Sequence, residues 1–119
     1  MRVLGVDPGL EATGYAVIEV AEASGVELLE AGVIHTQARR ALPERLLEIG
    51  RELRKVIAEF EPEALALEDL YSAYAHPKTA ILMGHARGVV CVVAAEAGLR
   101  VHSYAPARIK QSLVGTGRA

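Results

Sequence analysis

The stretch RVLGVDPGLEATG, residues 2–14, decides how the fold of this chain is interpreted. Its apolar part, residues 3–6, predicts a buried strand that delivers Asp7 into a turn favoured by Pro8 and Gly9. A carboxylate at the end of a buried strand is costly unless it meets a cation. Asp7 is therefore the first candidate for metal or phosphate chemistry.

Two further extended segments follow this turn. Residues 14–20 predict a second strand, the turn signal at residues 23–25 comes next, and a third strand is expected from 26 to about 36. Three successive strands joined by short loops predict an antiparallel meander.

The period of the apolar residues then changes. Between residues 42 and 60 they recur every three or four positions, with Pro43 near the first helical position, which predicts an amphipathic helix of about five turns. Residues 61–62 end it, and residues 64–67 predict a short strand. That strand runs into a second pair of carboxylates, Glu68 and Asp69, which repeats the arrangement at the first strand.

The last part of the chain alternates helix and strand. A second helix is expected from residue 77 to 97, ended by Gly98, and a fifth strand from 99 to 104. A turn at residues 105–106 leads to the start of another helix at 107–113.

This order of elements predicts one α/β domain over residues 1–119, with a mixed five-stranded sheet flanked by helices. The first, fourth and fifth strands can be parallel, since helical crossovers join the later ones. In such sheets function gathers at the carboxyl ends of central strands. Asp7 and Glu68 both stand at such ends.

Composition limits the class of protein. The 119 residues are 51% hydrophobic, enough for a buried core, and the single Cys91 cannot form an intramolecular disulfide. The longest apolar run, residues 89–95, is short of a bilayer span, so we expect a cytoplasmic protein with no membrane segment. Residues 1–75 carry a net charge of −7 and residues 76–119 carry +5, and such a basic half can make a local phosphate-binding surface.

Two carboxylates from separate strands can share one divalent cation. Because no His or Cys cluster accompanies them, Asp7 and Glu68 fit a hard ion, Mg²⁺ or alternatively Mn²⁺. This predicts metal-assisted phosphoryl chemistry. The competing interpretation, two strand-end acids that cap loops, stays open on the residues alone.

Four segments, in order along the whole chain, resemble the successive signatures of the RuvC family of Holliday-junction resolvases. They are LGVDPG with TGY (4–9 and 13–15), LEDLY (67–71), GHARG (84–88) and KQSLVGTG (110–117). The resemblance implies a ribonuclease-H-like fold, a homodimer, and a branch-migration motor complex as partner. It also implies that four-way DNA junctions are cut in recombination and repair by symmetric, Mg²⁺-dependent nicks.

Individual roles follow from this resemblance. Asp7 and Glu68 match two of the metal-binding catalytic acids, Tyr71 an aromatic residue that stacks on junction bases, and Lys110 a lysine near the scissile phosphate. Arg87, in the basic half, is predicted as a further DNA contact.

Two further expectations concern the helix at 77–97 and the end of the chain. Gly84 and Gly88 give that helix a small-residue face, for which the resemblance favours contact with a second subunit over contact with the sheet. Family members continue past the position of Ala119 into a last helix that completes the carboxylate cluster. We therefore expect a domain that lacks its final helix and cleaves weakly or not at all.

Three alternatives remain at this point. One is a non-catalytic module that binds four-way junctions and carries vestigial acids. Another is a fragment of the actin-like phosphotransferases, whose phosphate-binding loop also follows an Asp-x-Gly turn, although no second related half is present. A YqgF-like relative shares the fold, but the segments 84–88 and 110–115 favour the resolvases.

Overall fold

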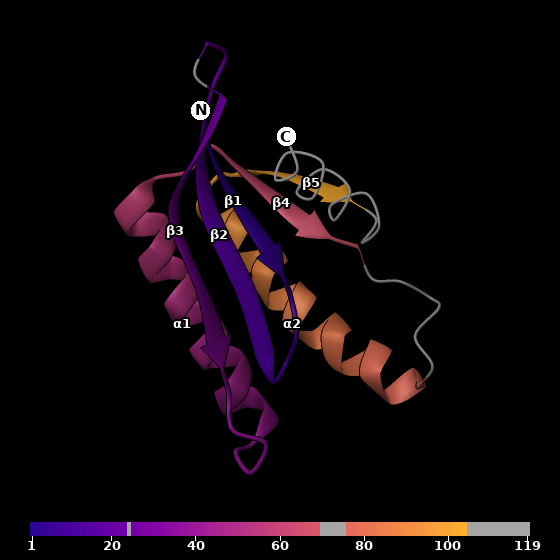
Figure 1. Ribbon diagram of the computed structural model, residues 1–119. Coiled ribbons are helices and arrows are strands. Elements are labelled where there is room, and N and C mark those ends of the chain that lie inside the picture. Colours follow the sequence, from indigo (N-terminus) through magenta and orange to yellow (C-terminus); the bar gives the residue numbers. More distant parts are fainter. Residues whose placement is uncertain (24, 70–75, 105–119) are drawn as a thin grey trace.

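The computed structural model describes residues 1–23, 25–69 and 76–104 (Figure 1). Five strands and two helices make up this part of the chain. They are β1 (Arg2–Asp7), β2 (Ala12–Ala21), β3 (Gly25–His35), α1 (Leu42–Phe60), β4 (Ala64–Glu68), α2 (Pro77–Glu96) and β5 (Arg100–Tyr104).

The strands form one mixed sheet in the order β3-β2-β1-β4-β5. The pairs β1–β2 and β2–β3 are antiparallel, while β1–β4 and β4–β5 are parallel. This confirms the predicted meander followed by parallel strands. The parallel pairs arise because α1 and α2 carry the chain back to the start of the sheet before β4 and β5 begin.

Both helices lie on one face of the sheet, behind it in Figure 1. Strand alternation points Leu4 and Val6 of β1 and Leu65 and Leu67 of β4 toward them. The helices complete the core with one stripe each: Ile49, Leu53 and Val56 from α1, and Ala86, Val90, Val93 and Ala94 from α2. In the described part of the chain, no helix covers the opposite face.

The element boundaries follow local chemistry. Each helix has a proline in its first turn, as expected at a position that needs no backbone donor. The chain leaves α1 at Glu61 and leaves the α2 region at Gly98, both with positive φ, 48° and 72°. The predicted turn at 105–106 and helix at 107–113 lie outside the described residues.

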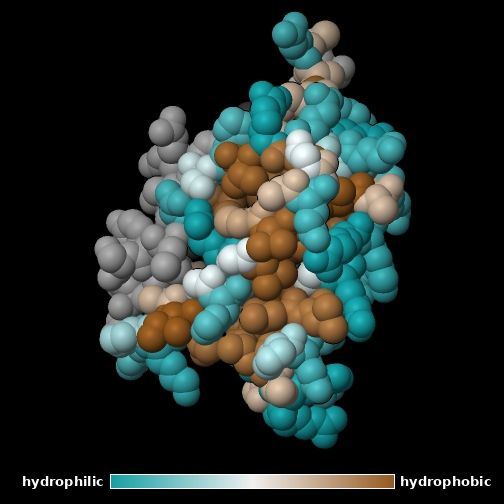
Figure 2. All heavy atoms as spheres, turned by 180° about the vertical axis from the view of Figure 1, so that it is seen from behind, coloured by the Kyte–Doolittle hydropathy of each residue, from teal (hydrophilic) through white to brown (hydrophobic). Residues whose placement is uncertain are grey.

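The helix α2 is rich in apolar residues and has no single apolar face, because they are spread around it. By length and composition alone it could cross a membrane, yet four of its residues belong to the core. Its outer side exposes Ile81 and Val92, and Figure 2, which views the molecule from behind, shows apolar side chains gathered in a patch on this side. Exposed apolar patches of this kind mark sites of interaction with another molecule or with a membrane.

Candidate active site

The structure brings Asp7 and Glu68 together. In the parallel pair β1–β4, Val6 stands opposite Leu67, so the next residues, Asp7 and Glu68, occupy neighbouring strand ends. Adjacent strands lie about 4.8 Å apart. Because Val6 and Leu67 point into the core, strand alternation directs both carboxylates to the face away from the helices.

Both carboxylates line one hollow of about 270 Å³. Small or apolar residues from three strands form the rest of its lining: Val3, Gly5, Val6, Gly14, Ala16, Ile18 and Ala66. The rest of the hollow is therefore uncharged, and its side chains are small or apolar. This donor set fits a hard divalent cation, because carboxylate oxygens are its preferred ligands and the small lining leaves room for its remaining ligands.

The turn that carries Asp7 is fixed by two residues of its motif. A side chain at Gly9 would collide with the carbonyl oxygen of Ala12, so the turn requires glycine. The fully buried Thr13 holds the same residue twice: its hydroxyl donates to the Gly9 carbonyl at 2.6 Å and accepts from the Gly9 N–H at 3.2 Å. The turn formed by DPG and the following TG is therefore stabilised by hydrogen bonds between its own residues.

A second brace links this turn to α1. The buried Thr36 hydroxyl donates to the Leu10 carbonyl, and the Thr36 N–H donates to the Glu11 carbonyl at 3.0 Å. Arg45 of α1 donates from Nε to the Thr36 hydroxyl at 2.9 Å. Sequence reasoning missed Thr36 and Arg45, since nothing in their spacing separates them from surface residues.

The adjacent acids Glu68 and Asp69 are divided between the two faces. Asp69 accepts a hydrogen bond and ion pair from Nη2 of Arg87 on α2, at 3.3 Å. The same Nη2 lies 3.0 Å from the Ser103 hydroxyl on β5. Asp69 therefore belongs to the helix side and does not join Asp7, while the predicted DNA contact of Arg87 stays a prediction.

The remaining predicted site residues, Tyr71 and Lys110, lie outside the described residues. Within residues 1–23, 25–69 and 76–104, no group of three or more His, Cys, Asp or Glu side chains comes together to hold a metal ion. The described part of the site is thus a pair of carboxylates.

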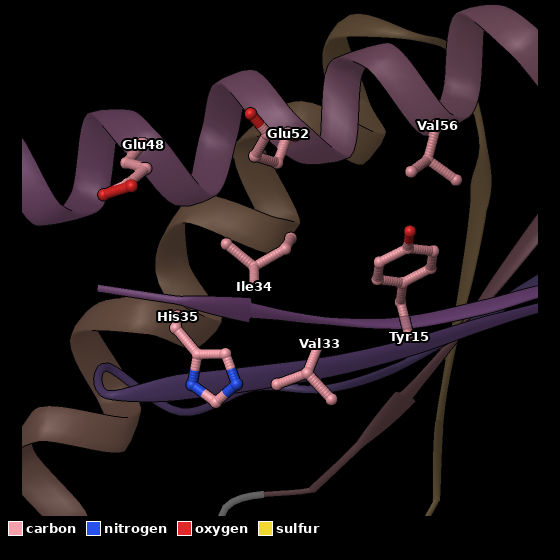
Figure 3. A pocket seen from close by; sticks show the side chains of 7 residues that line it. All are labelled: Tyr15, Val33, Ile34, His35, Glu48, Glu52 and Val56. Atoms are coloured by element: carbon pink, nitrogen blue, oxygen red, sulfur yellow. The ribbon is translucent and has the colours of Figure 1, made fainter.

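A second hollow, of about 210 Å³, lies between α1 and the strands β2 and β3 (Figure 3). The Tyr15 ring points from β2 toward α1, where Glu48 and Glu52 also line the hollow. Burial raises the pKa of Tyr15, and the carboxylates of Glu30, Glu52 and Glu59 raise this pKa further. This hollow is on the helix side of the sheet and is therefore separate from Asp7 and Glu68.

Comparison with known proteins points to one family. The family model described as "Crossover junction endodeoxyribonuclease RuvC" matches residues 3–119. Proteins of that name from Rhodopirellula baltica and Koribacter versatilis are 52% and 43% identical, over 98% and 100% of the chain. The chain spans 65% and 71% of their lengths.

A solved structure supports the same assignment. T. thermophilus RuvC in complex with Holliday junction substrate superposes with a TM-score of 0.88 at 36% identity, covering 97% of this chain and 69% of that one. The predicted ribonuclease-H-like sheet is thereby confirmed as the fold of those proteins.

Proposed function

Because the chain belongs to the RuvC family of crossover junction endodeoxyribonucleases, we propose that it cuts four-way DNA junctions with a divalent cation held by Asp7 and Glu68. The observation that carries this proposal is the placement of these two acids. They stand at paired ends of β1 and β4, on one face, around one hollow.

We assign Mg²⁺ as the cation, with Mn²⁺ as a substitute, since both accept carboxylate oxygen ligands. When bound, such an ion activates a water molecule and stabilises the charge that develops on the leaving oxygen of a phosphodiester. Asp7 and Glu68 hold it from neighbouring strands. The hydrogen bonds between Gly9 and Thr13 hold the turn that follows Asp7, which limits the positions that the Asp7 backbone can take.

The proposed substrate is a four-way junction, by analogy with the T. thermophilus complex. The net charge of +5 over residues 76–119 supports binding to DNA phosphates. In this proposal Tyr71 stacks on junction bases and Lys110 lies near the scissile phosphate, as the family resemblance implies. The branch-migration motor partner and the cytoplasmic location stay predictions.

We further propose that the apolar side of α2 pairs with a second copy of the chain. Between α1 and α2 runs a groove of about 560 Å³. Its lining is mostly apolar, with Leu46, Leu47, Val89 and Val92, and it also includes Arg54 and His85. In the described part of the chain, a Cβ added at Gly84 or Gly88 would meet no atom of another element within 4 Å. These glycines therefore do not serve packing against the sheet.

A second copy is the occupant that this surface favours. A twofold interface requires a surface that complements itself. The groove is mostly apolar, and the charge of Arg54 in its lining is paired with Glu96 at 2.9 Å, so two copies can meet there without unpaired like charges. Two subunits related in this way carry two carboxylate pairs. A junction with twofold symmetry could then be nicked on two opposing strands.

The dimer is tested with Val92→Glu, matched by Val26→Glu on the β3 edge, because these side chains are 56% and 55% exposed. Light scattering should show that Val92→Glu is monomeric at concentrations where the wild type and Val26→Glu are dimeric. A monomeric wild type would contradict the proposal. Binding of the wild type to lipid vesicles that Val92→Glu abolishes would also contradict it, because α2 would then face a membrane.

Cleavage by the 119 residues alone is proposed to be slow or absent. The described residues bring two carboxylates together, whereas a site that holds two metal ions uses more ligands. The test is a single-turnover nicking assay on a four-way junction with Mg²⁺, beside a linear duplex of the same sequence. Asp7→Asn and Glu68→Gln should abolish cleavage and retain junction binding. Glu48→Gln, in the other hollow, serves as the matched control.

Three results would contradict this proposal. A wild-type chain that binds junctions but does not bind a divalent cation through Asp7 and Glu68 is a binding module. Cleavage that survives Asp7→Asn does not use this site. Clear ATP binding by calorimetry would favour the actin-like alternative.

A further inference from the structure

Arg87 joins three elements that meet behind the carboxylate pair. It projects from α2, and its Nη2 reaches both Asp69, directly after β4, and Ser103 in β5. The Arg87 side chain is 27% exposed, and its Nε is buried without a hydrogen-bond partner in the described part of the chain. The guanidinium therefore contacts protein groups from two neighbouring strands through Nη2.

These contacts bracket Glu68 along the chain and across the sheet. Asp69 is the next residue after Glu68, so a fixed Asp69 carboxylate constrains the peptide that carries Glu68. Ser103 stands opposite Leu67 in the β4–β5 register, immediately before Glu68. The end of β4 is thus held on the helix side, while Glu68 points to the other face toward Asp7.

We propose that Arg87 is a positioning residue that fixes the end of β4 through Asp69 and Ser103, and so directs the Glu68 carboxylate toward Asp7. This rests on the proposed function, in which Glu68 holds the cation. Arg87 acts on that site from behind the sheet and does not contact DNA. In this proposal the two neighbouring acids of the motif LEDLY have different roles: Glu68 binds the metal ion, and Asp69 binds Arg87 of α2.

Electrostatics and positioning predict opposite effects for Arg87→Met. Arg87 and a bound cation repel each other, so electrostatics alone predicts that removal of the Arg87 charge tightens cation binding. Loss of a positioning contact weakens cation binding. We expect a loss of about threefold to tenfold, below the 10–100-fold typical of groups that hydrogen-bond directly to a metal-ligating side chain. The sign of the change therefore separates the two causes.

The test is a Mn²⁺ titration of the ¹⁵N-labelled 119-residue chain by NMR. Its readout is the paramagnetic broadening of the Val6 and Leu67 amide signals. Only folded molecules give these signals, so lost stability alone does not move the midpoint. Arg87→Met should raise the Mn²⁺ midpoint and Arg87→Lys should raise it less. Asp69→Asn, which keeps the acceptor's shape, is the second variant and should shift it in the same direction.

Two controls separate the possible failures. Arg40 precedes α1 and forms an exposed ion pair with Glu44 in the first turn of that helix. Arg40→Met breaks this pair and should leave the Mn²⁺ midpoint unchanged. If Glu68→Gln leaves the broadening unchanged, the proposed function fails. If Glu68→Gln removes it while Arg87→Met leaves it unchanged or tightens binding, the positioning role is overturned.

Junction binding gives an independent readout. In Ca²⁺ without cleavage, Arg87→Met should bind the junction as the wild type does, with the same salt dependence. A weaker affinity together with a salt slope reduced by about one would identify Arg87 as a phosphate contact and overturn the positioning role.

Discussion

Thr13→Val should destabilise the chain although it changes almost no volume. The fully buried hydroxyl makes two hydrogen bonds with Gly9, at 2.6 and 3.2 Å, and valine leaves both Gly9 groups unpaired. At about 1 kcal/mol for each bond, the free energy of unfolding should fall by about 2 kcal/mol. With an unfolding entropy of about 0.25 kcal/mol/K for a chain of this length, the melting temperature should fall by about 8 °C.

The measurement is urea unfolding at 25 °C together with a thermal melt. Thr13→Ser keeps the hydroxyl and should recover most of the lost free energy. Thr79→Val makes the same chemical change on the exposed first turn of α2 and should alter stability by less than about 0.5 kcal/mol. If Thr13→Val is as stable as Thr79→Val, the hydroxyl does not hold the turn that carries Asp7.

Two further predictions concern the sheet. Gly32→Ala should lower the unfolding free energy by about 1–3 kcal/mol in urea, because the added methyl group would lie 2.6 Å from the Tyr15 hydroxyl oxygen; unchanged stability would show that the ring moves freely. The amino terminus and Arg2 hydrogen-bond to Glu19 and hold the pKa of that carboxyl below its usual 4.5. This contribution is present above about pH 4.5 and is lost as the pH falls through the lowered pKa, so Glu19→Gln should flatten that part of the stability profile between pH 3 and 6; a superimposable profile would contradict it.

The sequence predicted the helices and strands well where the apolar residues follow one regular spacing. The spacing of Leu46, Ile49, Leu53 and Val56 allows only a helix with one buried face, and α1 has the predicted bounds, Leu42–Phe60. The strand β2 begins at Ala12, two residues earlier than predicted, because pairing with β3 reaches His35. Strand ends depend on the partner strand, which sequence patterns do not show.

The candidate site was predictable only in part. The sequence placed Asp7 and Glu68 at strand ends, and parallel pairing then brought them together. It could not divide Glu68 from Asp69, because the burial of Leu67 decides which acid faces which side. The sequence predicted a DNA contact for Arg87 and did not indicate its protein partners, because Asp69 and Ser103 are distant in sequence and meet only in the folded sheet.

The central claim is that Asp7 and Glu68 share a single divalent ion. It is tested most directly by Mn²⁺ affinities of the wild type, Asp7→Asn, Glu68→Gln and the double variant, read from the broadening of the Val6 and Leu67 amides. If one ion is shared, each single substitution removes most of the affinity and the double variant loses little more. Independent, additive losses, or affinities that none of the substitutions changes, would contradict it.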